Sequence, residues 1–177
     1  MKRIKKEHLK EIMDKVRKAG DSDNYETSWD EKGIPTSKKI SNIKKGRKSR
    51  AAGARFELKV RTQLEEKGWI MDKWTNNVDL EESKLVKAKR KYNPFKKVMV
   101  IGTGFPDFIA FRRYERYYEI IGVEVKMNGT LSKVEKQKCK WLIENNVFSR
   151  ILIAKKAEKR GQIDFIDFKE KYWDKLK

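Results

Sequence analysis

Apolar residues recur every three or four positions along residues 51–67, the spacing that places side chains on one face of an α-helix. Phe56, Val60 and Leu64 form this apolar stripe, and Gly68 follows where the pattern stops. Glycine is common just past a helix C-terminus because it adopts positive φ without a steric penalty. The pattern therefore predicts a helix from about residue 51 to residue 67.

A second helix is predicted at residues 132–145, where Ser132 and Glu135 have the spacing of a capping box. Shorter helices are expected at residues 5–18 and 169–176. The face of the second helix that carries Leu142 is expected to include Val134, Gln137 and Trp141.

Short segments rich in apolar, β-branched and aromatic residues predict β-strands. They are residues 69–74, 98–101, 108–112, 120–126, 151–154 and 163–168. The order of helix, strands, helix and further strand predicts an α/β domain with a mixed central β-sheet flanked by helices.

The polar segment between the first two predicted strands, residues 75–97, is expected to form a loop or an irregular hairpin. Residues 84–97 carry seven basic residues and no acidic one, and Asn93-Pro94 marks a turn. We expect this segment to face nucleic acid, and its candidate contact residues are Lys87, Lys89, Arg90 and Lys91.

Residues 1–53 are interpreted as a basic N-terminal extension, and residues 54–177 as the domain proper. Periodicity is lost over residues 20–50, and the part from residue 38 to residue 50 has seven basic residues and no acidic one. These residues are Lys38, Lys39, Lys44, Lys45, Arg47, Lys48 and Arg50. The segment is either a solvated, partly disordered arm or an arm that follows phosphates and orders on binding.

The charge balance points to a polyanionic partner. The chain has 45 Lys and Arg residues against 26 Asp and Glu residues, a formal net charge of +19. Counterion release favours every contact that such a chain makes with a phosphate backbone. A membrane is the weaker alternative, because no long apolar run is present and no segment forms a strongly amphipathic basic helix.

Histidine and cysteine chemistry is excluded by their scarcity. His8 and Cys139 are the sole residues of their types, so neither a histidine pair nor a disulfide framework can form. Chemistry on a phosphodiester would then rest on carboxylates, lysines and a hard metal ion. A cytoplasmic protein is expected, since no apolar stretch follows the basic N-terminus.

The candidate chemistry begins in the apolar strand at residues 121–126. Side chains alternate along a strand, so Glu124 and Lys126 share one face while Ile121 and Val123 point to the other. For this triplet alone, a cross-strand ion pair on a solvated face is the favoured explanation.

A second carboxylate shifts the comparison from a simple ion pair towards a functional site. Asp107 starts an apolar strand directly after Gly104-Phe-Pro, and its simplest role is to cap backbone amides in a turn. If the two strands pair, however, Asp107 and Glu124 converge on one face and repel each other unless a cation lies between them. Mg²⁺ fits such a site because it binds a few carboxylate oxygens and retains exchangeable waters.

This arrangement resembles the PD-(D/E)XK nuclease superfamily. The match consists of Pro106-Asp107, an interval of 17 residues, and then Glu124-Val125-Lys126. Glu57 resembles the glutamate that members often carry on the preceding helix, and Gln137 the residue on the following one. The stretch 53–68 looks like archaeal Holliday-junction resolvases, and the stretch 104–155 like the VRR-type nuclease domains of phages and viruses. The long basic segment 73–97 departs from the resolvase pattern.

The resemblance implies a restriction-endonuclease-like core and a role for each residue. Asp107, Glu124 and the main-chain carbonyl of Val125 would bind Mg²⁺, with Mn²⁺ as a substitute. Lys126 would orient water or offset charge in the transition state. Glu57 would act in an outer shell or hold a second ion, although an ordinary surface pair with Arg61 would also explain it. Gln137 would help to position the water or the phosphate.

The expected function is therefore that of a Mg²⁺-dependent endonuclease acting on duplex or branched DNA, with a homodimer suggested by the resolvase likeness. Two alternatives remain from other classes. One is a non-catalytic nucleic-acid-binding protein, and the other a basic ribosome-associated or RNA-packaging protein. Metal-dependent cleavage, together with the distance between the two carboxyl groups, separates these readings.

Overall fold

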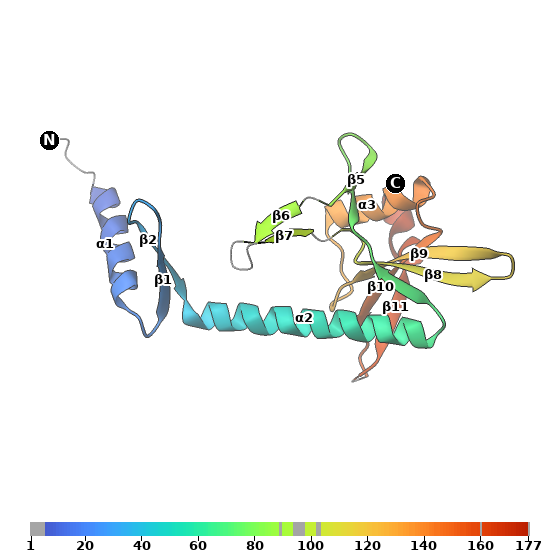
Figure 1. Ribbon diagram of the computed structural model, residues 1–177, viewed down its shortest axis with the longest axis horizontal. Coiled ribbons are helices and arrows are strands. Elements are labelled where there is room, and N and C mark those ends of the chain that lie inside the picture. Colours follow the sequence, from blue (N-terminus) through green and yellow to red (C-terminus); the bar gives the residue numbers. More distant parts are fainter. Residues whose placement is uncertain (1–5, 89, 94–97, 102–103, 160, 177) are drawn as a thin grey trace. The chain divides into compact units, whose positions relative to one another are not determined.

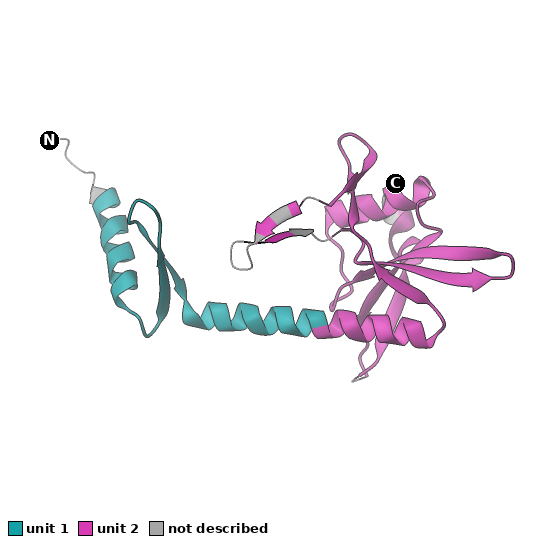
Figure 2. Cartoon of the chain, viewed as in Figure 1, with its two compact units in different colours: residues 1–54 teal, residues 55–177 magenta. Residues whose placement is uncertain are grey.

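The computed structural model of the chain describes residues 6–88, 90–93, 98–101, 104–159 and 161–176 (Figure 1). Contacts divide the chain into two compact units, Met1–Ala54 and Arg55–Lys177 (Figure 2). One long helix, α2 (Ile40–Glu66), contributes residues to both units.

The first unit contains helix α1 (Lys6–Gly20), a hairpin of β1 (Tyr25–Trp29) and β2 (Pro35–Lys39), and the first half of α2. In the hairpin turn the Asp30 carboxylate accepts the backbone N–H groups of Lys32 and Ile34. Gly33 follows with a φ of 70°, a conformation that glycine adopts freely. The helix expected at residues 5–18 is confirmed.

The partly disordered arm expected over residues 20–50 is not what the structure shows, because these residues form the hairpin and the start of α2. The alternative, an arm that follows phosphates and orders on binding, stays a prediction. The helix begins at Ile40 and not near residue 51. Residues 41–55 of this helix are exposed or half-buried on every side. The apolar periodicity on which the prediction rested is therefore absent there, although the backbone is helical.

The second unit is built on a five-stranded sheet in the order β11-β10-β9-β8-β3. The strands are β3 (Ile70–Lys73), β8 (Phe108–Tyr114), β9 (Tyr117–Val125), β10 (Arg150–Lys156) and β11 (Ile163–Asp167). β9 and β10 are parallel and the other neighbours are antiparallel, so the predicted α/β class with a mixed central sheet is confirmed.

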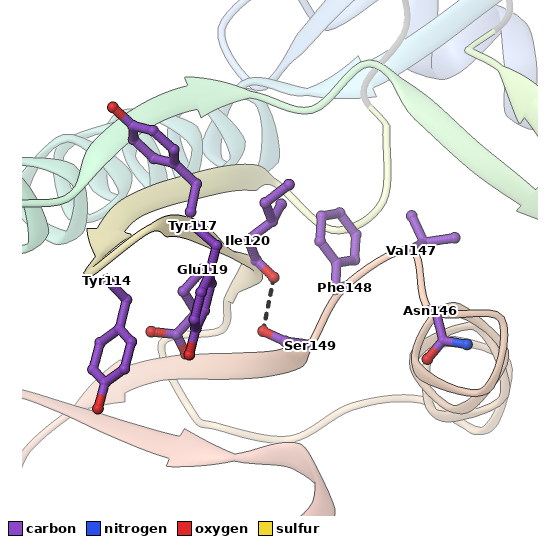
Figure 3. A pocket seen from close by; sticks show the side chains of 9 residues that line it. Tyr114, Tyr117, Glu119, Ile120, Asn146, Val147, Phe148 and Ser149 are labelled. Carbon is purple, nitrogen blue, oxygen red and sulfur yellow. Dashed lines mark hydrogen bonds between the residues drawn. The ribbon is translucent and has the colours of Figure 1, made fainter.

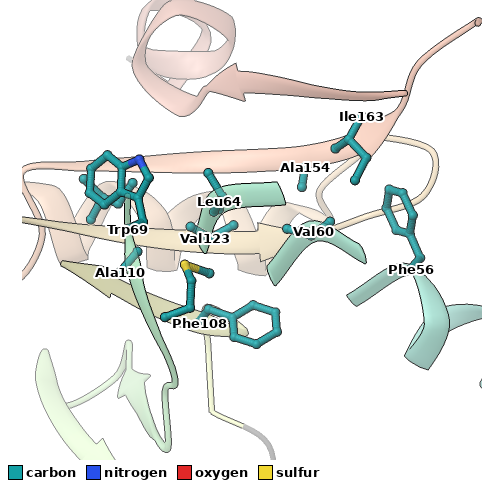
Figure 4. Close-up of a cluster of buried hydrophobic side chains, with 11 residues drawn as sticks. Phe56, Val60, Leu64, Trp69, Phe108, Ala110, Val123, Ala154 and Ile163 are labelled. Atoms are coloured by element: carbon teal, nitrogen blue, oxygen red, sulfur yellow. The ribbon is translucent and has the colours of Figure 1, made fainter. Parts of the chain in front are cut away.

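One face of the sheet is covered by the second half of α2. Phe56, Val60 and Leu64 pack against Val123 of β9 and Ala154 of β10 (Figure 4). All five side chains are buried, and the helix ends before Gly68, whose φ is 81°. The predicted apolar stripe and the predicted helix end are both confirmed.

The opposite face carries α3 (Lys133–Glu144), α4 (Phe168–Tyr172) and the 3₁₀ turn η1 (Trp173–Leu176). Their side chains form a second buried cluster with Ile151 and Ile153 of β10. The capping box of Ser132 and Glu135 starts α3 as predicted. Because Ile153 and Ala154 are neighbours on β10 and belong to different clusters, the sheet separates two cores.

Two small hairpins lie between β3 and β8 in the chain. They pair β4 (Asn76–Asp79) with β5 (Lys84–Lys87) and β6 (Arg90–Asn93) with β7 (Val98–Ile101). The irregular hairpin expected in this region is therefore present, while the turn expected after Asn93 falls on residues 94–97, outside the described residues. Among the described helices, none combines the length and apolar character needed to cross a membrane.

Candidate active site

The register of β8 and β9 places Asp107 opposite Glu124. Phe108 pairs with Val123, so the preceding residue on one strand faces the following residue on the other. The Asp107 N–H donates to Oε2 of Glu124 over 3.1 Å, and the Val125 N–H donates to Oδ2 of Asp107 over 2.9 Å. Each carboxylate is thus held by a backbone amide of the facing strand.

Two glycines allow the chain to approach this point. A Cβ on Gly104 would lie 2.3 Å from the carbonyl oxygen of Trp74 and 2.5 Å from that of Asn76. A Cβ on Gly122 would lie 2.8 Å from Cγ of Pro106, the residue before Asp107. Glycine at both positions therefore lets the turn before Asp107 lie directly against β4 and β9.

Burial disfavours the ionised form of these two carboxylates. Glu124 is 4% exposed, and it is the one buried charged residue among the described residues. Burial and then the nearby Asp107 carboxylate raise the pKa of Glu124 to about 7, against the partial opposition of Lys126. Burial also raises the pKa of Asp107, and the Glu57 carboxylate adds to this, while the Val125 amide and two lysines oppose it. A bound cation would reduce the repulsion between the two carboxylates.

Lys126 bridges this pair to α3. Its Nζ lies 3.1 Å from Oε1 of Glu124 and 2.6 Å from Oε1 of Glu135. Burial alone would lower the pKa of Lys126, but the two carboxylates outweigh it and hold the pKa above its ordinary value. The lysine therefore stays protonated at neutral pH.

Glu135 uses its two carboxylate oxygens for different tasks. Oε1 accepts from Lys126, while Oε2 accepts from the Ser132 N–H over 2.7 Å in the capping box. Lys126 and the Ser132 amide together outweigh the effect of burial and lower the pKa of Glu135. Glu135 could be identified in the sequence as part of the capping box. Because that role explained the residue by itself, its contact with Lys126 was not anticipated.

Gln137, expected at the site, is exposed on α3. Residues two positions apart on a helix point about 200° from each other, so Gln137 and Glu135 lie on different faces. The expected apolar face of α3 is also wrong, because Val134 is 53% exposed and the buried residues are Cys139, Leu142 and Ile143.

Glu57 faces the site from α2, with Lys73 of β3 as its partner. Lys73 Nζ lies 2.5 Å from Oε2 of Glu57, and it also lies over the Phe108 ring at 4.2 Å from the centroid. The alternative pairing of Glu57 with Arg61 is not what the structure shows, since Arg61 contacts Glu65. Sequence reasoning missed Lys73 because only the pairing of β3 with β8 brings it here.

The donor set suits a hard divalent cation. Asp107 and Glu124 offer carboxylate oxygens on adjacent strands, and the Val125 N–H and C=O point to the same edge of β9. Within the part of the chain that the structure describes, no group of three or more acidic, histidine or cysteine side chains is arranged around a common point. A cation here would rely on two side chains, main-chain oxygen and water, as Mg²⁺ often does.

The structure describes the exposure of nine predicted nucleic-acid-binding residues, and all nine are exposed. In the first unit, the seven candidates from Lys38 to Arg50 are all exposed on β2 and α2. In the second unit, Lys87 and Arg90 are exposed on β5 and β6, and Lys91 belongs to β6. Lys89 lies outside the described residues.

Comparison with known proteins gives no relative from which a function could be transferred. No protein-family model matches the chain, and neither a curated protein nor a solved structure matches it. The function must therefore be argued from the geometry of the site.

Proposed function

We propose that the chain is a Mg²⁺-dependent endonuclease that hydrolyses phosphodiester bonds of DNA, with a restriction-endonuclease-like core of the PD-(D/E)XK type. One observation carries the proposal. A buried carboxylate, Glu124, and a half-buried one, Asp107, face each other across adjacent strands beside the amine of Lys126. Buried like charges are costly for a fold, and metal binding supplies a reason to keep them.

Each residue of the site then has a task. Asp107, Glu124 and the Val125 carbonyl would hold Mg²⁺, which when bound polarises a phosphate and lowers the pKa of water. Lys126, held protonated, places a positive charge where negative charge grows in the transition state. Glu57 and Lys73 flank Asp107 and tune its charge. The basic N-terminal extension and the hairpins at residues 76–101 would hold the DNA backbone.

One observation favours a non-catalytic nucleic-acid-binding protein as the second candidate. Lysines already contact three of the acidic residues: Lys126 contacts Glu124 and Glu135, and Lys73 contacts Glu57. A site balanced in this way can exist for stability alone. In that case the net charge of +19 would be the functional feature.

A cleavage panel separates the two candidates. Duplex, branched and single-stranded DNAs are incubated with the full chain and Mg²⁺ or Mn²⁺, and parallel reactions contain a chelator. Glu124→Gln is compared with Glu65→Gln, which removes a carboxylate from an exposed ion pair on α2. We expect products with metal for the wild type and Glu65→Gln, and none for Glu124→Gln. Tight binding without cleavage in every reaction would favour the second candidate.

A further inference from the structure

An exposed group of three tyrosines lies at the β8–β9 hairpin, at the opposite end of β9 from Glu124. Tyr114, Tyr117 and Tyr118 are 51%, 58% and 56% exposed, although large aromatic side chains usually supply core area. Tyr114 pairs directly with Tyr117 across the hairpin, and their ring centroids are 5.4 Å apart. None of the three belongs to either buried cluster, so the two cores do not explain them.

The tyrosines line an open pocket of about 630 Å³ (Figure 3). Its other wall is the segment 146–149 that follows α3, and Ser149 holds this wall in place. Both the hydroxyl and the backbone N–H of Ser149 donate to the Ile120 carbonyl, over 2.9 Å and 3.0 Å. The pocket is thus a fixed feature of the second unit with flat, exposed aromatic rings at its edge.

Basic residues outnumber acidic ones in the segments around the pocket. Residues 108–120 and 146–150 contain four arginines, at positions 112, 113, 116 and 150, and two acidic residues, Glu115 and Glu119, a balance of 4 − 2 = +2. Glu119 contacts both Arg112 and Arg150, so one carboxylate is shared between two guanidinium groups. Flat rings beside excess positive charge complement a ligand with flat rings joined by phosphates.

We propose that the tyrosines of this hairpin form a stacking site for unpaired bases of a single-stranded nucleic acid, with the paired rings of Tyr114 and Tyr117 on one face of the sheet and Tyr118 on the other. Base stacking on aromatic side chains does not depend on sequence, because every base has a π-face. A duplex would not occupy the site in the same way, since its bases are already stacked on each other.

The position of the site gives it a consequence for the substrate, and this step rests on the proposed nuclease function. Tyr118 and Glu124 are six residues apart on β9, roughly 20 Å at the rise of a strand. A substrate that reached both places would carry an unpaired segment about 20 Å from the bond that is cut. The substrate class is therefore DNA with an unpaired segment, branched, gapped or single-stranded, rather than uninterrupted duplex.

Binding without cleavage tests the stacking site. The full chain is titrated, in the presence of a chelator, into labelled oligothymidine, oligouridine and a duplex of equal length. The double variant Tyr114→Ala/Tyr117→Ala is compared with Tyr114→Phe/Tyr117→Phe, which keeps both rings, and with Ile70→Ala, which removes an exposed apolar side chain from β3. Circular dichroism and thermal unfolding establish that each variant is folded.

We expect the double alanine variant to bind oligothymidine at least roughly tenfold more weakly, because one stacked base contributes roughly 5- to 150-fold. Duplex affinity should change less than twofold, and the phenylalanine and Ile70 variants should bind like the wild type. Equal losses for oligouridine extend the site to RNA, whereas a loss for oligothymidine alone restricts it to DNA. An unchanged single-strand affinity, or equal losses for single strand and duplex, would overturn the inference.

The chelator keeps this inference separate from the nuclease proposal. If Mg²⁺ produces no cleavage but the ring-dependent preference for single strands is present, the stacking site stands without the enzyme. If Mg²⁺ produces cleavage and the alanine variant binds and cuts every substrate like the wild type, the stacking site is refuted and the enzyme stands.

Discussion

Among single residues, Glu124 carries the highest energetic cost in the second unit. Its carboxylate is nearly inaccessible to water and lies against a second carboxylate, that of Asp107. Removing an ion from water is expensive unless nearby groups compensate, and here Lys126 and the Asp107 N–H compensate only in part. The raised pKa of Glu124, about 7, reflects this incomplete compensation. Because the folded and unfolded states then bind the proton differently, the free energy of unfolding depends on pH.

The free energy of unfolding should fall as the pH rises from 4.5 to about 7 in the absence of divalent ions. The folded state holds the Glu124 proton more tightly than the unfolded state, so this stabilisation is complete below 4.5 and is lost through about 7. The loss is on the order of 3 kcal/mol. Urea unfolding of wild type and Glu124→Gln across this range measures it as a difference. Parallel curves would show that Glu124 ionises as freely as an exposed glutamate.

Glu135→Gln should reduce cleavage roughly 10- to 100-fold through kcat, with KM and stability nearly unchanged. Glutamine still serves in a capping box, but it no longer holds the Lys126 amine by charge. Ser132→Ala is the matched control, because it should lower stability by about 1 kcal/mol and leave cleavage intact. Glu135→Asp should lie between wild type and glutamine. If cleavage fell in proportion to the loss of stability in all three variants, Glu135 would act only as a helix cap.

At the level of elements, strand register and two close backbone approaches place the candidate site. Asp107 reaches Glu124 because β8 and β9 pair with Phe108 opposite Val123. The turn that leads into β8 is in contact with β4, whose Asn76 carbonyl accepts the Phe105 N–H over 2.9 Å. A change at Gly104 therefore acts on the site from a position outside it.

Gly104→Ala should lower the free energy of unfolding by roughly 1–3 kcal/mol and displace Asp107 from Glu124. The added methyl would meet backbone oxygens of Trp74 and Asn76, which cannot move as a flexible side chain does. Gly53→Ala on α2 has open space around it and should be neutral or slightly stabilising. Chemical denaturation of both variants checks this. Equal stability of the two variants would mean that β4 moves to accommodate the added methyl group without loss of stability.

Most elements with one buried face could be predicted from the sequence, whereas among the exposed elements α1 and β7 could be predicted and others could not. β8 to β11 and the second half of α2 follow apolar patterns that their burial explains. α3 was predicted from its capping box. The β1–β2 hairpin and residues 40–50 of α2 lack buried side chains, so no pattern marked them. The opposition of Asp107 and Glu124 could be anticipated from two pairing strands. Lys73 could not be assigned to the site from the sequence, because only the pairing of β3 with β8 brings it there. Glu135 was predicted as part of the capping box, so its contact with Lys126 was not anticipated.

At the level of the whole molecule, charge is the dominant property. The net charge is +19, and residues 40–56 of α2 contain six basic residues and no acidic one. Like charges at neighbouring helix positions repel each other, so this segment gains from any polyanion that lies along it. The carboxylates at the candidate site are the local exception to a basic chain, and a bound cation would reconcile them with an approaching phosphate.

Alanine at Lys44, Lys45 and Lys48 together should weaken duplex binding and reduce the slope of log affinity against log salt. Each phosphate that a lysine no longer neutralises lowers that slope by about 0.9, without regard to sequence. Alanine at three exposed lysines outside the proposed DNA-binding segments, Lys133, Lys156 and Lys159, provides a control of equal charge. Fluorescence anisotropy at several salt concentrations measures both. Identical slopes for the two triple variants would show that α2 does not bind the DNA backbone.

The assignment of Asp107 and Glu124 as ligands of the metal on which cleavage depends can be tested by one paired measurement. Cleavage with Mg²⁺ and DNA affinity are measured for the wild type and for Asp107→Asn on the same DNA. We expect metal-dependent cleavage by the wild type. Asp107→Asn should show none, yet bind DNA as tightly or more tightly, because losing a carboxylate empties the metal site and relieves repulsion of the phosphate. Metal-dependent cleavage by Asp107→Asn at the wild-type rate would contradict the assignment.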